Sequence, residues 1–239
     1  MRNNPIQILS TRPLAPQLLQ EAASENVWID CVSFIETSVN ISPQVKDRIK
    51  QLAAEKTAVV FTSMNAAEAV IASLDGTKPE WDIYCMGGTT KTIVKEHFGD
   101  DSIKGTGKDA VSLAQTLIDN PAKEAVFFCG NIRRDELPQL LSTHQVDLEE
   151  IVVYATEATP ILIDKKYDGI LFYSPSAVES FFSINTVDTS TILFAIGNTT
   201  AKTIANYSGN TVVVSDSPDK DSLARKAVGH FAPIHTPIP

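Results

Sequence analysis

Short apolar runs alternate along the chain with longer segments in which apolar residues recur every three or four positions. Apolar runs of about four to eight residues are typical of buried strands, and the wider spacing is typical of amphipathic helices. The runs predict strands over residues 6–10, 27–32, 57–62, 81–86, 124–129, 148–154, 169–173, 191–196 and 211–214. The wider spacing predicts helices over residues 15–25, 42–54, 65–74, 89–98, 112–119, 135–143, 177–184, 199–207 and 222–231. This alternation predicts an α/β fold with parallel sheets flanked by helices.

Several of these segments occur twice, in the same order and about 110 residues apart. Residues 60–68 resemble 171–179, residues 86–90 resemble 196–200, and residues 109–114 resemble 219–224. A fainter echo links residues 16–19 to 138–141. A repeat of this length is the size of a domain, far longer than the units of solenoid proteins. The repeat predicts two similar domains with a cleft between them, where ligands commonly bind.

Composition narrows the class of protein. The 239 residues are 43% apolar and 21% charged, which is ordinary for a globular protein. No apolar run approaches the ~20 residues of a membrane helix, and the N-terminus lacks the apolar core of a signal peptide. The formal charge of −9 argues against nucleic acid as a partner. Cys31, Cys85 and Cys129 are widely spaced, which fits neither a zinc motif nor a disulfide framework. We therefore expect a cytoplasmic protein.

Candidate chemistry lies in the loops that follow the predicted strands, because open parallel sheets bind ligands at the carboxyl ends of their strands. These loops are rich in small and hydroxyl residues and lead into helices, whose free N-terminal amides suit anions. The candidate substrate-binding residues in these loops are Arg12, Thr62, Ser63, Asn65, Gly87, Thr89, Gly130, Asn131, Arg133, Ser174, Ser176, Gly197, Thr199 and Thr200. The alternative for Ser63, Asn65, Thr89, Ser174 and Thr199 is that each caps a helix. The alternative for Arg133 is a solvated residue at a helix start.

Signatures of other enzyme classes are absent from the sequence. The phosphate-binding patterns GxGxxG and GxxxxGK[ST] do not occur, and neither Ser63 nor Ser174 lies in a GxSxG motif. The four histidines fall on predicted helices or on the C-terminal tail, without the clustering that a metal needs. We therefore expect no metal and no cofactor. Tyr154, at the end of a predicted strand, is either a proton donor or an ordinary strand aromatic.

Six short motifs together resemble the uroporphyrinogen-III synthase family. They are Thr11-Arg12-Pro13, Val60-Phe61-Thr62-Ser63, Cys129-Gly130-Asn131, Val152-Val153-Tyr154, residues 172–178 and residues 196–201. Each motif is weak alone, but their order and spacing cover nearly the whole chain. The departures are Met64 in place of a small residue or proline, Asn26 in place of glycine, and a second glycine at Gly88.

The resemblance implies a discontinuous arrangement of the repeat. Residues 1–35 and 160–239 would form one domain, residues 40–154 the other, and residues 36–39 and 155–159 a two-stranded linker, with the cleft between the domains. Composition alone would suggest a plain tandem pair divided near residue 120.

The resemblance also implies an activity, that of a cyclising hydro-lyase in porphyrin and heme biosynthesis. The linear substrate hydroxymethylbilane would lose water and close to uroporphyrinogen III, with ring D inverted through a spiro intermediate. Tyr154 would be the catalytic proton donor. Because this substrate carries eight carboxylates and the protein is acidic, local groups such as Arg12, Lys91 or Arg133 would have to attract it. We expect a monomer, and a transient contact with the preceding synthase remains open.

A second class of function fits the same pattern. A non-catalytic two-domain sensor or binding protein that closes on a small anion would also have hydroxyl-rich loops and a hinge. Turnover of the bilane to a cyclic product would belong to the enzyme alone.

Overall fold

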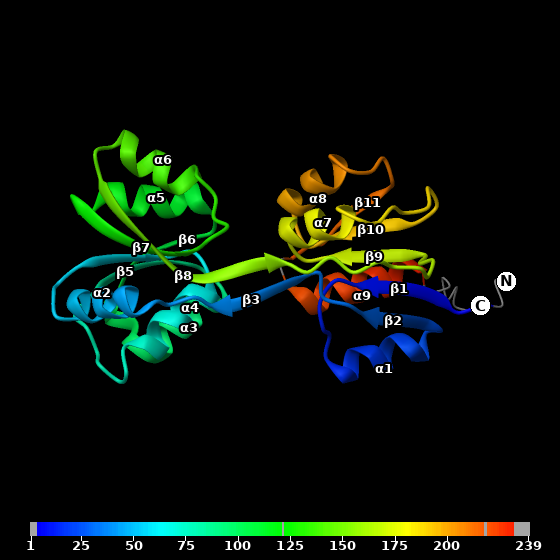
Figure 1. The fold of residues 1–239 in the computed structure, drawn as a ribbon, viewed down its shortest axis with the longest axis horizontal. Coiled ribbons are helices and arrows are strands. Elements are labelled where there is room, and N and C mark those ends of the chain that lie inside the picture. Colours follow the sequence, from blue (N-terminus) through cyan, green and yellow to red (C-terminus); the bar gives the residue numbers. More distant parts are fainter. Residues whose placement is uncertain (1–3, 121, 218, 232–239) are drawn as a thin grey trace, which may run out of the picture. The chain divides into compact units, whose positions relative to one another are not determined.

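A computed structural model describes residues 4–120, 122–217 and 219–231. The chain divides into two compact units (Figure 1). Unit one combines the N-terminal stretch through Glu36 with the chain from Glu157 onwards, and unit two comprises Thr37–Thr156. Each unit is an α/β layer of parallel strands between helices, which confirms the predicted fold class.

Unit one is a five-stranded sheet in the order β11-β10-β9-β1-β2. Its neighbouring strands all pair in parallel. The strands are β1 (Ile6–Ser10), β2 (Val27–Cys31), β9 (Gly169–Phe172), β10 (Ile192–Ala195) and β11 (Val212–Val214). The helices are α1 (Pro16–Ser24), α7 (Pro175–Phe182), α8 (Asn198–Ala205) and α9 (Lys220–Phe231).

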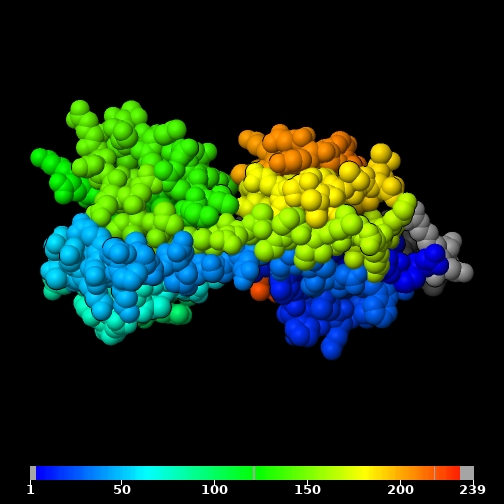
Figure 2. All heavy atoms as spheres, viewed as in Figure 1, coloured from blue at the N-terminus to red at the C-terminus, as the bar shows by residue number. Residues whose placement is uncertain are grey.

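The helices of unit one cover both faces of its sheet. Apolar residues of α1 and α9 share one buried cluster with Ile8 and Leu171. Residues of α7 and α8 share another with Leu9 and Phe172. Successive strand residues therefore point to opposite faces of the sheet, and both faces are buried beneath helices, as is typical of a parallel sheet. Figure 2 shows α7 and α8 as adjacent yellow and orange surfaces.

Unit two is a six-stranded sheet in the order β3-β8-β7-β4-β5-β6. The strands are β3 (Ile35–Val39), β4 (Ala58–Phe61), β5 (Asp82–Met86), β6 (Ile103–Gly107), β7 (Glu124–Gly130) and β8 (Asp147–Ala158). The helices are α2 (Pro43–Ala53), α3 (Met64–Ser73), α4 (Thr89–Phe98), α5 (Ala110–Asp119) and α6 (Glu136–Thr143), with a 3-10 turn, η1, at Asp100–Ser102. Strands β4 to β8 pair in parallel, α2, α3 and α4 cover one face, and α5 and α6 cover the other.

The internal repeat corresponds to a shared topology. Reading unit one as β2-β1-β9-β10-β11 and unit two as β8-β7-β4-β5-β6 pairs each strand with its counterpart. The faint echo at Pro16 and Pro138 falls on α1 and α6, which are counterparts in this arrangement. A tandem split near residue 120 does not describe the chain, because β1 pairs with β9 across more than 150 residues of sequence.

The repeated motif at residues 109–114 and 219–224 has a structural explanation. Asp109 accepts a hydrogen bond from the Ser112 backbone amide at 2.8 Å, and Asp219 accepts one from that of Ser222 at 2.8 Å. Each aspartate thus satisfies a free amide at the start of its helix, α5 or α9. The hydrogen bonds from Ser112 hold the pKa of Asp109 below its usual value.

The predicted helices and strands are confirmed to within a few residues, with three differences. β3 and β6 are strands that the pattern does not predict, and β8 continues to Ala158 through the expected linker. The sequence of β6 is Ile103-Lys104-Gly105-Thr106-Gly107. With two glycines and one large apolar residue, it lacks the apolar run by which strands were predicted. Gly105 is needed there, since an added Cβ would lie 2.8 Å from the Tyr84 ring.

Candidate functional site

The loops singled out by the sequence lie along the carboxyl edge of each sheet. In unit two the neighbouring strands β7, β4 and β5 end beside Asn131, Ser63 and Gly87, and Tyr154 of β8 pairs with Gly130, the last residue of β7. In unit one the neighbouring strands β10, β9 and β1 end beside Gly197, Ser174 and Arg12. Parallel pairing places these loops next to one another within each unit, so each edge is a continuous row of candidate residues.

Two of the predicted binding residues are helix caps. The Ser63 side chain accepts a hydrogen bond from the Asn65 amide at 3.2 Å, and the Ser174 side chain accepts one from the Ala177 amide at 3.1 Å. The capping alternative therefore holds for both serines. Asn65 and Ser176 lie inside the first turns of α3 and α7 rather than at the caps, and Thr62 is half-buried at the end of β4.

The counterpart helices α4 and α8 begin differently. Their N-cap residues are Gly88 and Gly197, and neither helix has a side-chain cap. Thr89 and Thr199 lie within the helices and are exposed, so the capping alternative is wrong for them, whereas Thr200 is buried. Uncapped first-turn amides with the positive end of the helix dipole favour an anion.

Glycines shape the turn before α4. Gly88 has a φ of +70°, a conformation that only glycine adopts readily. The Gly87 amide donates to the Gly107 carbonyl at 2.9 Å, so it is already used within the sheet. Gly87 therefore shapes the loop, and the amides beyond Gly88 are the ones open to a ligand.

Tyr154 lies at an irregularity in β8. Cys129 pairs with Val152 and Gly130 pairs with Tyr154, so Val153 is an extra residue in the ladder. Such a bulge changes the direction of the following side chain. Strict alternation would send Val153 and Tyr154 to opposite faces, yet both contact the core cluster beneath α2, α3 and α4. The ring of Tyr154 is half-buried over Gly130, and among the described residues its hydroxyl has no hydrogen-bond partner.

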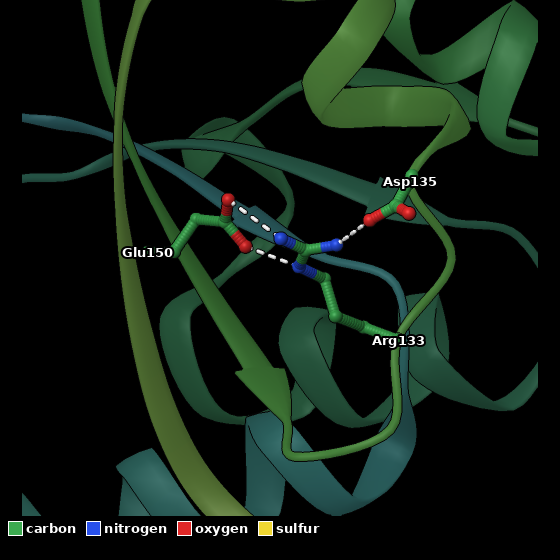
Figure 3. A network of polar contacts seen from close by, with 3 residues as sticks. All are labelled: Arg133, Asp135 and Glu150. Carbon is green, nitrogen blue, oxygen red and sulfur yellow. Dashed lines mark hydrogen bonds and ion pairs between the residues drawn. The ribbon is translucent and has the colours of Figure 1, made fainter.

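Asn131 and Arg133 lie in the loop after β7, and both are engaged by protein groups. The Asn131 side chain accepts from the Thr156 amide at 2.8 Å and donates to the Thr156 carbonyl at 3.2 Å. The Arg133 guanidinium lies between Glu150 of β8 and Asp135 at the start of α6 (Figure 3). Its hydrogen bonds with Glu150 are the main reason why the pKa of Arg133 is raised. Sequence patterns gave no sign of Glu150 as its partner.

Arg12 in unit one is exposed, and it forms no ion pair with any residue in the described ranges. Its guanidinium lies 5.5 Å from the centre of the Tyr173 ring, within the range of a cation–π contact. Burial raises the pKa of Tyr173 to about 12, so this phenol stays neutral at physiological pH. The Tyr173 hydroxyl and the Thr11 hydroxyl are buried without a partner among the described residues. Both residues lie in loops that the sequence singled out after the strands, but neither was among the predicted site residues.

The described residues also bear on metal, thiol and membrane chemistry. No group of three or more His, Cys, Asp or Glu side chains is placed there to hold a metal ion. Burial raises the pKa of Cys85 and that of Cys129 to about 11, so both stay protonated thiols at neutral pH. None of the helices in the described ranges is long and apolar enough to cross a membrane.

Comparison with known proteins places this geometry in context. The chain is 28% identical over 173 residues to uroporphyrinogen-III synthase of Saccharomyces cerevisiae, an alignment that covers 59% of this chain and 61% of the yeast protein. The chain thus spans about three fifths of the length of this curated relative.

Two solved structures share the fold over 94% of the chain. Uroporphyrinogen-III synthetase from Helicobacter pylori superposes with a TM-score of 0.63 over 99% of its own chain, at 15% identity. A mutant uroporphyrinogen III synthase from the extremely thermophilic bacterium Thermus thermophilus superposes with a TM-score of 0.69 over 98% of its chain, at 13% identity. Residues 21–225 match the family model described as uroporphyrinogen-III synthase HemD. Because that match covers most of the sequence, the chain belongs to the uroporphyrinogen-III synthase family.

Proposed function

We propose that the protein is a uroporphyrinogen-III synthase that converts hydroxymethylbilane to uroporphyrinogen III and releases water. The observation that carries this proposal is the row of loops at the carboxyl edge of unit two. There Tyr154 lies within β8, opposite the last residue of β7, and its hydroxyl has no hydrogen-bond partner among the described residues; the uncapped start of α4 lies in the same row. A family member with a free phenol and free helix amides on one edge has the groups that this reaction needs.

The first step is loss of the terminal hydroxyl of the bilane as water. Tyr154 donates a proton to the departing oxygen, as a general acid. The azafulvene that results is attacked by the substituted carbon of ring D, which gives a spiro intermediate. That intermediate fragments and closes again with ring D inverted. Because the bilane closes in water without inversion, the protein acts mainly by holding the reacting carbons in one arrangement.

The substrate's carboxylates need local attraction, since the protein's net charge of −9 repels them at long range. The uncapped N-termini of α4 and α8 supply backbone amides for this purpose. Arg12 in unit one and Lys91 in the first turn of α4 supply positive charge without a competing ion pair among the described residues. Arg133 is less suited, because protein carboxylates already neutralise it.

A product-isomer assay tests the proposal. The protein is added to a bilane-producing synthase, and the oxidised products are separated by chromatography. We expect the product to change from the type I isomer, formed without the protein, to the type III isomer. If only type I forms at high protein concentration, the proposal is wrong. Binding of the bilane without a cyclic product would favour the sensor alternative instead.

A further inference from the structure

We infer that Asn131 and Arg133 position Tyr154 by fastening the loop after β7 to β8, and that neither is a ligand of the substrate. This inference rests on the proposed function for its effect on turnover. Its structural part, the attachment of β8 to the loop, can be tested by a measurement that does not depend on enzyme activity.

The first attachment lies four residues before Tyr154. The Arg133 Nη2 atom donates to one Glu150 carboxylate oxygen at 2.9 Å, while Nε donates to the other. This two-point contact fixes both distance and orientation, which a single ion pair would not. A third donor, Nη1, is bound to Asp135, so the guanidinium also ties the loop to the start of α6 (Figure 3).

The second attachment lies two residues after Tyr154. Strand β7 ends at Gly130, and the Asn131 backbone amide donates to the Tyr154 carbonyl at 3.1 Å. The Asn131 side-chain amide then binds both the N–H and the C=O of Thr156. It occupies the place of the next strand residue, so β8 stays paired beyond the end of its neighbour.

The two attachments lie on either side of Tyr154, the proposed proton donor, along β8. Tyr154 lies between Glu150 and Thr156 on β8, and its ring rests on Gly130 at the base of the same loop. A loop held at both points therefore sets where the phenol oxygen lies. Substrate carboxylates would have to displace Glu150 and Asp135 to reach Arg133, and would leave those two carboxylates unpaired.

The test compares Arg133→Gln, Glu150→Gln and the double variant. Glu149→Gln is the matched control, because Glu149 is the residue before Glu150 on β8 and binds Arg48 of α2 by the same two-point contact, at 2.9 and 2.7 Å. Each variant is assayed for kcat and KM, and amide hydrogen exchange is followed in peptides that cover residues 150–158. Asn131→Ala is measured in the same way.

We expect Arg133→Gln and Glu150→Gln each to lower kcat by about tenfold while KM stays within about twofold, since a small misplacement of a reacting group is costly. The double variant should be no slower than either single variant, because both remove one interaction. Exchange over 150–158 should accelerate in all three and in Asn131→Ala, and Glu149→Gln should keep the wild-type kcat.

Two outcomes would overturn the inference. A large rise in KM for Arg133→Gln, with normal kinetics for Glu150→Gln, would make Arg133 a substrate ligand. Unchanged exchange over 150–158 in every variant would mean that the loop does not hold β8. If the wild-type protein itself shows no turnover, the proposed function fails, and the exchange measurement still decides whether the loop fastens β8.

Discussion

The ring of Tyr154 lies directly over the α-carbon of Gly130. A Cβ atom built on Gly130 would be 2.5 Å from Cζ of Tyr154 and 2.8 Å from its hydroxyl oxygen. No real side chains approach so closely. Gly130 does not have a positive φ, so this position needs glycine because of the ring above it and not because of its backbone.

We predict that Gly130→Ala displaces the Tyr154 ring. The free energy of unfolding should fall by about 1–3 kcal/mol, as in other overpacked sites, and the rate of type III product should fall with it. Urea unfolding and initial rates measure the two effects. Gly209→Ala is the control, because an added Cβ there meets no atom within 4 Å, and surface changes of this kind usually stay within about 0.5 kcal/mol.

The same substitution in a Tyr154→Ala protein tests whether the Tyr154 ring causes this loss of stability. When Tyr154 is replaced by alanine, the ring is gone, and Gly130→Ala should then cost much less than in the wild-type protein. An equal cost in both backgrounds would show that something other than the ring excludes a side chain at Gly130.

We predict that Tyr154→Phe slows formation of uroporphyrinogen III by about tenfold to a hundredfold. General-acid assistance typically contributes about 10²–10⁴-fold, but this leaving group departs readily without help, so we expect a loss at or below the bottom of that range. The ring and its contacts remain, so the melting temperature should change little. A fully active Tyr154→Phe protein would remove Tyr154 as the acid, and conformational control of the bilane would then account for most of the catalysis.

The sequence predicts the helices and buried strands well because their cores follow simple periodicities. Strands such as β4 and β9 are continuous apolar runs, and Ser63 and Ser174 stand where helix caps are expected. β6 escaped prediction because its stability comes from tertiary pairing with β5, which no local pattern reports. The repeat predicts two similar units, but only the long-range pairing of β1 with β9 shows how they are connected.

The candidate site was predicted less completely than the fold. Strand-end loops can be located from the sequence, so the positions of Asn131 and Gly197 follow directly, whereas Tyr154 was expected at a strand end and lies inside β8. What their side chains bind does not follow, because the partners of Arg133 and Asn131 lie 17 and 25 residues away on β8. The bulge that turns Tyr154 has no local signal either, since Val152-Val153-Tyr154 reads as an ordinary strand.

We predict that Tyr173 makes the protein less stable at high pH. Burial raises its pKa from 10 to about 12. Between pH 10 and 12 the unfolded chain loses this proton while the folded chain keeps it, so the free energy of unfolding falls as pH rises. A shift of this size corresponds to on the order of 3 kcal/mol.

The measurement compares the wild-type protein with Tyr173→Phe by urea unfolding at pH 9.5 and 11.5. The difference between the two proteins isolates Tyr173, because other alkaline groups titrate in both. We expect the wild-type protein to lose more stability than the variant over this interval. Equal losses would show that the phenol ionises normally in the folded state.

We predict that Gly197→Asp stabilises the protein but weakens substrate binding. The backbone of Gly197 is extended, which any residue can adopt, and an added Cβ meets no atom within 4 Å. An aspartate there would cap the free amides of α8 and should raise the free energy of unfolding by a few tenths of a kcal/mol. The same carboxylate would take the place proposed for a substrate carboxylate, so KM should rise by about tenfold or more, which corresponds to about 1.4 kcal/mol.

Gly197→Asn gives a neutral cap of the same size and should raise KM less. Gly209→Asp makes the same change in net charge before β11, at the opposite end of the strands, and should leave KM close to that of the wild-type protein. If Gly197→Asp and Gly209→Asp raise KM equally, the effect is one of overall charge, and the start of α8 does not bind the substrate.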